Sequence, residues 1–138
     1  MGLVYQHIRL SNAAKPELDE IDANALVDSG AIDLCITPLI AKQLRLTKLE
    51  DRMITMADGR SEIVEYVGPV LVEVFGRRTF TGALVTGNQV LLGAIPMESM
   101  DVLIDPRRQQ LIPNPAHPNI PGAMAVGVLP ARKEDDNA

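Results

Sequence analysis

One short stretch organises the rest of the chain, Ala25-Leu26-Val27-Asp28-Ser29-Gly30-Ala31. Its first three residues are apolar and typical of a strand that enters a core. Asp28 and Ser29 end the apolar run, and Gly30 allows the backbone to turn sharply. A carboxyl group at the end of a buried strand is poorly solvated, which suits it to general acid–base chemistry. The same tripeptide is also ordinary turn chemistry, because Asp and Ser hydrogen-bond their own backbone.

The composition predicts one domain with an aliphatic core. The chain has 138 residues, with two Phe, two Tyr and no Trp, so Val, Leu, Ile, Ala and Met must fill the interior. With a net charge of -5, the chain lacks the excess of positive charge that binding to nucleic-acid phosphates requires. Scarce aromatic residues also argue against stacking on nucleic-acid bases. We therefore expect no nucleic-acid partner.

The single cysteine, Cys35, excludes an internal disulfide and is compatible with a reducing cytosol. The sequence has neither a signal-peptide pattern nor an apolar run of membrane-spanning length. His7, His117 and Cys35 lack the spacing of metal ligands, so we expect structural or surface roles for them. These patterns predict a cytoplasmic protein with no metal, no other cofactor and no membrane partner.

Loose alternation of apolar and polar residues predicts strands over 3–10 and 18–27, joined by a loop into a hairpin. An apolar segment follows at 32–36. Thr37 and Pro38 are typical of a helix start, so a short helix is expected over 38–44. Further elements are expected as strands at 67–74, 78–86, 102–104 and 110–112 and helical turns at 96–100.

A hairpin is predicted over 54–64, because Asp58 and Gly59 lie between two strand-like runs. Asp-Gly favours a type I′ turn, which needs positive φ at both central residues. The hairpin tip is expected to project into solvent. It is either a mobile cover over a cleft or a simple surface connection, and the local pattern alone favours the connection.

The tripeptide Gly-Ala-Ile occurs twice, at 30–32 and at 93–95. Each copy follows an apolar strand and precedes a helix that starts with proline. The repeated tripeptide suggests an internal two-fold repeat.

These motifs together resemble the retroviral-type (retropepsin-like) aspartic proteases, and more narrowly their small bacterial and archaeal relatives of the same clan. The resemblance rests on Asp-Ser-Gly-Ala after an apolar strand, a glycine-bearing hairpin at 56–60, and Leu91-Leu92-Gly93 before a short helix. It covers residues 1–112. It implies an all-β fold, a closed acid-protease barrel with one or two short helices per subunit. Only one such Asp is present, so activity implies a symmetric homodimer.

Carried onto this sequence, the resemblance makes Asp28 the catalytic carboxylate of an endopeptidase that acts on peptides or proteins. Two such carboxyls, about 3 Å apart in the dimer, would share one proton, and one would activate a water while the other protonates the carbonyl oxygen. Ser29, Gly30 and Ala31 would support the active-site loop, with Ser29 hydrogen-bonding across the dimer axis.

The resemblance also assigns the remaining site residues. Leu92 and Gly93 would pack beside the active-site loop. The flap over the substrate would contain Met56, Ala57, Asp58 and Gly59. This flap tip is polar, whereas the viral enzymes have a glycine-rich apolar tip.

Residues 113–138 are expected to be an extended tail without a core, because five prolines interrupt any regular element. Three roles for the tail stay open. It reinforces the dimer, occupies the cleft as an inhibitor, or has no contact with the domain.

The main alternative function is a non-catalytic, dimeric peptide-binding or scaffold module of the same fold. Other enzyme classes are disfavoured, because the sequence lacks the Gly-x-Ser-x-Gly elbow and the phosphate-binding Gly-x-x-x-x-Gly-Lys. Four other aspartates are better explained by turns and solvated faces: Asp22, Asp33, Asp101 and Asp105.

Overall fold

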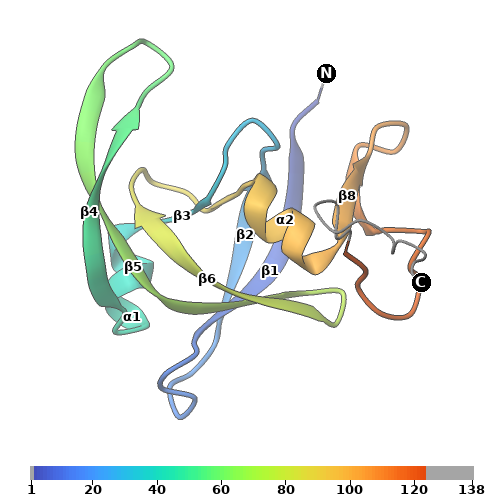
Figure 1. The fold of residues 1–138 in the computed structure, drawn as a ribbon, viewed down its shortest axis with the longest axis horizontal. Coiled ribbons are helices and arrows are strands. Elements are labelled where there is room, and N and C mark those ends of the chain that lie inside the picture. The colour runs from blue at the N-terminus through green and yellow to red at the C-terminus, as the bar shows by residue number, and fades with distance from the viewer. Residues whose placement is uncertain (1, 124–138) are drawn as a thin grey trace, which may run out of the picture.

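Nine strands and two short helices form the part of the chain that the structure describes, residues 2–123 of a computed structural model (Figure 1). The strands are β1 (Val4–Asn12), β2 (Ile21–Val27), β3 (Leu34–Ile36), β4 (Thr47–Thr55), β5 (Ser61–Val74), β6 (Arg77–Val85), β7 (Leu91–Leu92), β8 (Val102–Asp105) and β9 (Gln110–Pro113). The helices are α1 (Pro38–Gln43) and α2 (Ala94–Met100).

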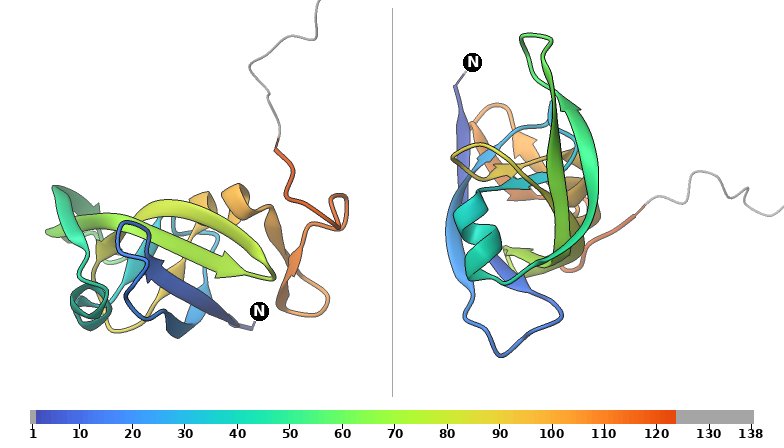
Figure 2. Two further views of the ribbon diagram at one scale, coloured as in Figure 1. Left: turned by 90° about the horizontal axis from the view of Figure 1, so that it is seen from below. Right: turned by 90° about the vertical axis from the view of Figure 1, so that its left-hand side faces the viewer.

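Six strands close into a barrel. They are hydrogen-bonded in the order β1-β2-β7-β3-β6-β5, and β1 also pairs with β5. β4 extends the sheet from β5 outside this ring, and β8 pairs with β9 in a separate sheet. Figures 1 and 2 show the barrel, with the hairpin of β4 and β5 projecting beyond it. The expected closed, all-β barrel is confirmed.

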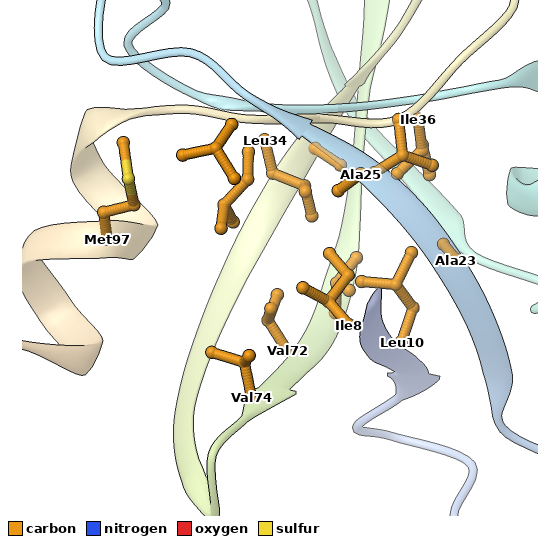
Figure 3. Close-up of a cluster of buried hydrophobic side chains, with 14 of the residues drawn as sticks. Ile8, Leu10, Ala23, Ala25, Leu34, Ile36, Val72, Val74 and Met97 are labelled. Atoms are coloured by element: carbon orange, nitrogen blue, oxygen red, sulfur yellow. The ribbon is translucent and has the colours of Figure 1, made fainter. Parts of the chain in front are cut away.

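Aliphatic side chains fill the barrel, as the composition predicts (Figure 3). Leu10 in β1 and Val72 in β5 hold paired positions in the sheet, and both are fully buried. Met97 of α2 joins the same cluster. Its buried members are only Val, Leu, Ile, Ala and Met. Burial of this apolar surface stabilises the fold by about 1.5–3 kcal/mol for each fully buried large side chain.

The hairpin of β1 and β2 confirms the predicted alternation, although β1 runs further than residue 10. Ser11 and Asn12 extend the strand by pairing with β5, and Asn12 is buried although polar. Its amide nitrogen donates to the Leu44 carbonyl at 2.8 Å and the Arg45 carbonyl at 3.2 Å, and its oxygen accepts from the Ala14 N–H at 2.8 Å. Asn12 therefore links the end of β1 to the end of α1.

The turn prediction for Asp58 and Gly59 was wrong in its type. The Met56 carbonyl accepts from the Gly59 N–H at 2.9 Å, and only Gly59 in this loop has positive φ, at 90°. This is a three-residue loop with a bulge rather than a type I′ turn. Phe75 and Gly76, between β5 and β6, both have positive φ, at 54° and 73°, as a type I′ turn requires.

A side chain caps the start of α1, whereas α2 begins after Gly93 without a side-chain cap. The Thr37 hydroxyl accepts from the Ile40 N–H at 3.2 Å, which confirms the predicted start of α1. α2 begins at Ala94, two residues before the expected start at Pro96. Proline is tolerated there, because the first turn of a helix has no internal partner for its N–H groups.

The second sheet is the predicted pair of strands near residues 102–112. β9 continues to Pro113, and residues 114–123 follow without regular secondary structure. The rest of the expected tail, 124–138, lies outside the described residues. Within 2–123, no helix is long and apolar enough to cross a membrane.

We predict that Asn12→Ala lowers the free energy of unfolding by about 1–3 kcal/mol, because it leaves the buried Leu44 carbonyl unpaired. Urea denaturation of the folded protein measures the change. The control is His7→Ala, an exposed residue of the same strand, with an expected change within about 0.5 kcal/mol. Equal effects of the two variants would contradict the role assigned to Asn12.

Candidate active site

Asp28 lies at the end of β2, where the barrel sheet fixes its backbone. β2 runs parallel to β7, with Val27 paired with Leu92. The Asp28 N–H donates to the Leu92 carbonyl at 3.0 Å, which continues this pairing one residue beyond the strand. The position of the Asp28 backbone is therefore fixed by its pairing with β7 in the barrel.

The loop after β2 folds around the Asp28 carboxylate. Oδ1 of Asp28 accepts from the Gly30 N–H at 2.9 Å, and the Asp28 carbonyl accepts from the Ala31 N–H at 3.1 Å. Asp28 is half-buried, whereas Ser29 and Gly30 are exposed. In a single chain the carboxylate is therefore oriented by its own loop and still open to solvent. The tripeptide Asp28-Ser29-Gly30 therefore forms the turn and also orients the candidate catalytic carboxylate.

The two Gly-Ala-Ile segments lie side by side. The Ala94 N–H donates to the Ala31 carbonyl at 2.8 Å, and the Ile95 N–H donates to the Ile32 carbonyl at 2.9 Å. A Cβ atom on Gly93 would stand only 2.3 Å from the Asp33 carbonyl oxygen. Only glycine allows this approach, so Leu92 and Gly93 pack beside the loop that carries Asp28.

The hairpin of β4 and β5 has an ionic tip. Arg60 Nε lies 2.7 Å from Asp58 Oδ2, and the Arg60 N–H donates to Asp58 Oδ1 at 3.0 Å. The Arg60 backbone and side-chain hydrogen bonds lower the pKa of Asp58. Met56 is half-buried, whereas Ala57, Asp58 and Gly59 are exposed. The hairpin tip therefore presents paired charges to solvent.

A second apolar cluster connects this hairpin to the strands beside Asp28, and sequence reasoning missed it. Its buried members are Cys35, Val64 and Leu84. Ile54, Tyr66 and Leu91 pack against them. The members come from β3 to β7, whose adjacency only the closed barrel defines.

Cys35 places this cluster close to the candidate carboxylate. The thiol is buried, and its pKa is raised first by desolvation and then by the negative charges of Asp33 and Asp28. Cys35 also pairs with Leu91 in the sheet. This buried cluster therefore lies between β7, the strand paired with β2, and the projecting hairpin.

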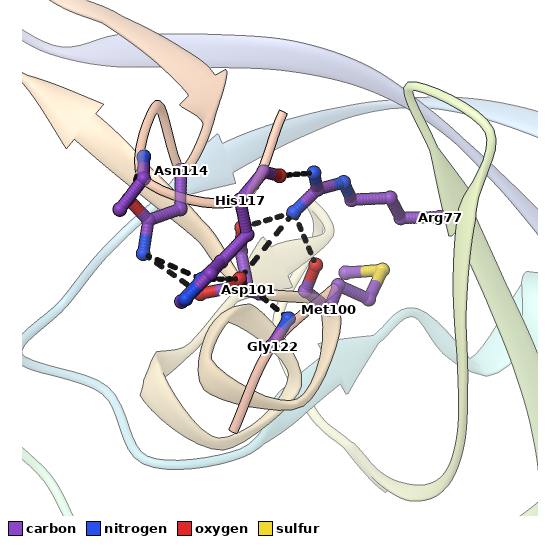
Figure 4. A network of polar contacts seen from close by, with 7 residues as sticks. Arg77, Met100, Asp101, Asn114, His117 and Gly122 are labelled. Carbon is purple, nitrogen blue, oxygen red and sulfur yellow. Dashed lines mark hydrogen bonds and ion pairs between the residues drawn. The ribbon is translucent and has the colours of Figure 1, made fainter. Parts of the chain in front are cut away.

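Asp101 lies in the turn that ends α2, as the sequence suggests, but its side chain is the centre of a polar network and is not solvated (Figure 4). Its side chain is only 14% exposed. Its carboxylate accepts from Asn114 Nδ2 at 3.0 Å and from the Gly122 N–H at 2.7 Å, and lies 2.6 Å from Nδ1 of His117. The hydrogen bond from Asn114, followed by that from Gly122, lowers the pKa of Asp101 to about 2.

Arg77 completes the network from the start of β6 and is almost fully buried. Its guanidinium donates to the Asp101 carbonyl at 2.8 Å and to the His117 carbonyl. The network ties residues 114–122 to the end of α2. The network has no recognisable sequence motif, because Arg77 and its partner His117 lie 40 residues apart.

We predict that Gly93→Ala destabilises the protein by about 3 kcal/mol, because the added Cβ forces the two Gly-Ala-Ile segments apart. Hydrogen exchange of the Ala94 and Ile95 amides should accelerate. The control is Gly87→Ala, where φ is 77° but no atom lies within 4 Å of the new Cβ. Its expected cost is about 1 kcal/mol, without faster exchange at Ala94.

We predict a pH-dependent contribution from Asp101. Its pKa falls from an ordinary value of 3.8 to about 2 on folding, so its stabilisation is complete above pH 3.8 and is lost as the pH falls through 2. Thermal denaturation between pH 6 and pH 2 measures it. Asp101→Asn should be less stable than the parent at pH 6 and should lose less stability on acidification. An unchanged pH profile would contradict the network.

Comparison with known proteins identifies no family. No protein-family model matches the chain, and no curated protein matches it in sequence. Within residues 2–123, no three His, Cys, Asp or Glu side chains gather in a way that would hold a metal ion. A proposed function therefore rests on the geometry around Asp28.

Proposed function

We propose that the chain is one subunit of a homodimeric, retropepsin-like aspartic endopeptidase, with Asp28 from each copy forming the catalytic pair. The main support for the proposal is the environment of Asp28. Its backbone is fixed by the Leu92 carbonyl, one carboxylate oxygen is held by the Gly30 N–H, and the group is still half-exposed. A rigidly positioned, accessible carboxylate is what acid–base catalysis requires.

The chemistry follows from bringing two such carboxyls together. Close carboxylates repel, so the pair retains one proton. The ionised Asp28 accepts a proton from water as the water oxygen bonds to the peptide carbonyl carbon. The protonated Asp28 donates to the carbonyl oxygen. On collapse of the tetrahedral gem-diol, one of its hydroxyls returns a proton to the ionised Asp28. The C–N bond breaks and the departing nitrogen takes the proton of the other Asp28, so the pair again holds one proton.

Substrate binding is assigned to the side of Asp28 that faces the β4–β5 hairpin. The partly buried members of the second apolar cluster, Ile54, Tyr66 and Leu91, supply an apolar lining for a substrate side chain. The projecting hairpin supplies a cover, with Met56 as its half-buried apolar residue near the tip. An endopeptidase that accepts apolar residues next to the cleaved bond is the expected specificity.

A non-catalytic peptide-binding module of the same fold is the second candidate. The observation that favours it is the salt-bridged tip, where Asp58 and Arg60 take the place of an apolar contact to substrate. Both candidates use the same dimer and the same apolar lining. They differ in whether Asp28 takes part in catalysis or only helps to form the binding site.

We predict that Asp28→Asn lowers cleavage of a peptide library between about pH 4 and pH 7 by a thousandfold or more, because an amide cannot exchange the proton. Mass spectrometry of the products measures cleavage. The control is Asp22→Asn, on the same strand with its side chain 80% exposed, which should cleave like the parent. Binding without cleavage by the parent would favour the binding module, and equal cleavage by Asp28→Asn would exclude Asp28 as the catalyst.

A further inference from the structure

Two adjoining cavities form a groove along α2, on the side of β8. The larger cavity, of about 750 Å³, is lined by Ala123, the last described residue. The smaller cavity, of about 270 Å³, is lined by Ser29, the residue after Asp28. Both cavities are also lined by Glu98 and Val102, so they adjoin. This α2–β8 groove therefore connects the point where the described chain ends with the loop of the candidate active site.

Large apolar side chains are exposed in the α2–β8 groove. Ile95 lines the larger cavity and is 50% exposed. Leu103 lines the smaller cavity and is 37% exposed. A continuous exposed apolar surface is commonly a site at which another segment binds. The groove is therefore suited to a peptide with apolar side chains.

The Asp101 network fixes the point at which the chain reaches the groove (Figure 4). The Asp101 carboxylate accepts from the Gly122 N–H at 2.7 Å. A Cβ atom on Gly122 would stand only 2.6 Å from the His117 ring, so the backbone lies directly against this ring. Gly122 immediately precedes Ala123. The residues after Ala123 therefore start from a fixed position beside the groove.

The next six residues have the composition that the groove accepts. They are Met124-Ala125-Val126-Gly127-Val128-Leu129, all without charge or polar side chains, and Pro130 follows. Six extended residues span about 20 Å, whereas the seven residues of α2 span about 10 Å. The segment is therefore long enough to follow α2 from Ala123 to Ser29.

We propose that residues 124–129 dock in the α2–β8 groove of their own chain and cover Ser29 beside the candidate catalytic residue. The segment is tethered at Ala123, so docking is intramolecular and proceeds at an effective concentration in about the millimolar range. In an extended peptide alternate side chains share a face, which directs Val126 and Val128 together toward the apolar lining.

The regulatory meaning of this docking rests on the proposed function. A catalytic pair forms only when the loops that carry Asp28 in two subunits meet. A segment that covers Ser29 opposes this approach, so residues 124–129 act as an autoinhibitory element. The docking itself does not depend on peptidase activity.

Methyl NMR of the full chain tests the docking. Nuclear Overhauser effects should connect the methyl groups of Val126 and Val128 with those of Ile95 and Leu103. In a mixture of isotope-labelled and unlabelled chains, these contacts should stay within one chain. Contacts found only between chains would mean that a second copy fills the groove. That result, or the absence of these contacts in the parent, would overturn the proposal.

The double variant Val126→Asp with Val128→Asp should lose the contacts, because the groove offers no compensation for two buried carboxylates. The substitutions lie outside residues 2–123, so the described fold is kept. The matched control, Asn137→Asp with Ala138→Asp, adds the same charge outside 124–129 and should keep the contacts. Loss of the contacts in both variants would contradict docking through apolar side chains.

Cleavage of the peptide library measures the inhibition. A segment docked about nine-tenths of the time leaves about one-tenth of the chains open, so Val126→Asp with Val128→Asp should cleave about tenfold faster than the parent. The control variant should cleave like the parent, and equal rates for all three would overturn the inhibitory role. If none of the three cleaves while the parent shows the NMR contacts, the proposed function fails and the docking stands.

Discussion

The hydrogen bonds between the segment after β2 and the segment after β7 hold the candidate site in place. Asp28 N–H to the Leu92 carbonyl, and Ala94 N–H to the Ala31 carbonyl, join two stretches more than sixty residues apart. The contact is possible because Gly93 has no side chain. Without it, the loop of Asp28 would be held only by its own turn bonds, as a surface loop is.

α2 connects this constraint to residues 114–122. Its first two N–H groups bind the carbonyls after Asp28, its Met97 and Met100 enter the core, and Asp101 at its end holds residues 114–122. Arg77 is buried at that end of α2, where its guanidinium donates hydrogen bonds to backbone carbonyl groups. The carbonyl dipoles and the carboxylate of Asp101 therefore compensate its positive charge. A helix of seven residues thus joins the candidate site to the C-terminal network.

Much of the fold was predictable, because its elements depend on local patterns. Alternation located β1 and β2, Thr37 located the start of α1, and glycine located the turns. The turn types were less predictable. Asp58 stays out of positive φ because its carboxylate binds the Arg60 backbone, whereas Phe75 adopts positive φ because the tight connection from β5 to β6 requires it. Such outcomes depend on the strands on either side.

The site was predictable in part for the same reason. Asp28 and Gly93 lie in recognisable motifs, and the structure brings them together. The second apolar cluster around Cys35 and the network of Asp101 were not predictable, because each is formed by residues from several elements. His117 and Asp101 have no signature in sequence, because a histidine and an aspartate sixteen residues apart meet only after the second sheet has folded.

The buried thiol has a practical consequence for studying the protein. Cys35 is the single cysteine, and its raised pKa and burial leave little thiolate to react with maleimides or iodoacetamides. A cysteine introduced at an exposed site such as Ala57 would therefore take a fluorophore selectively, with no need to remove the native thiol. The hairpin tip can then be followed spectroscopically in an otherwise unaltered molecule.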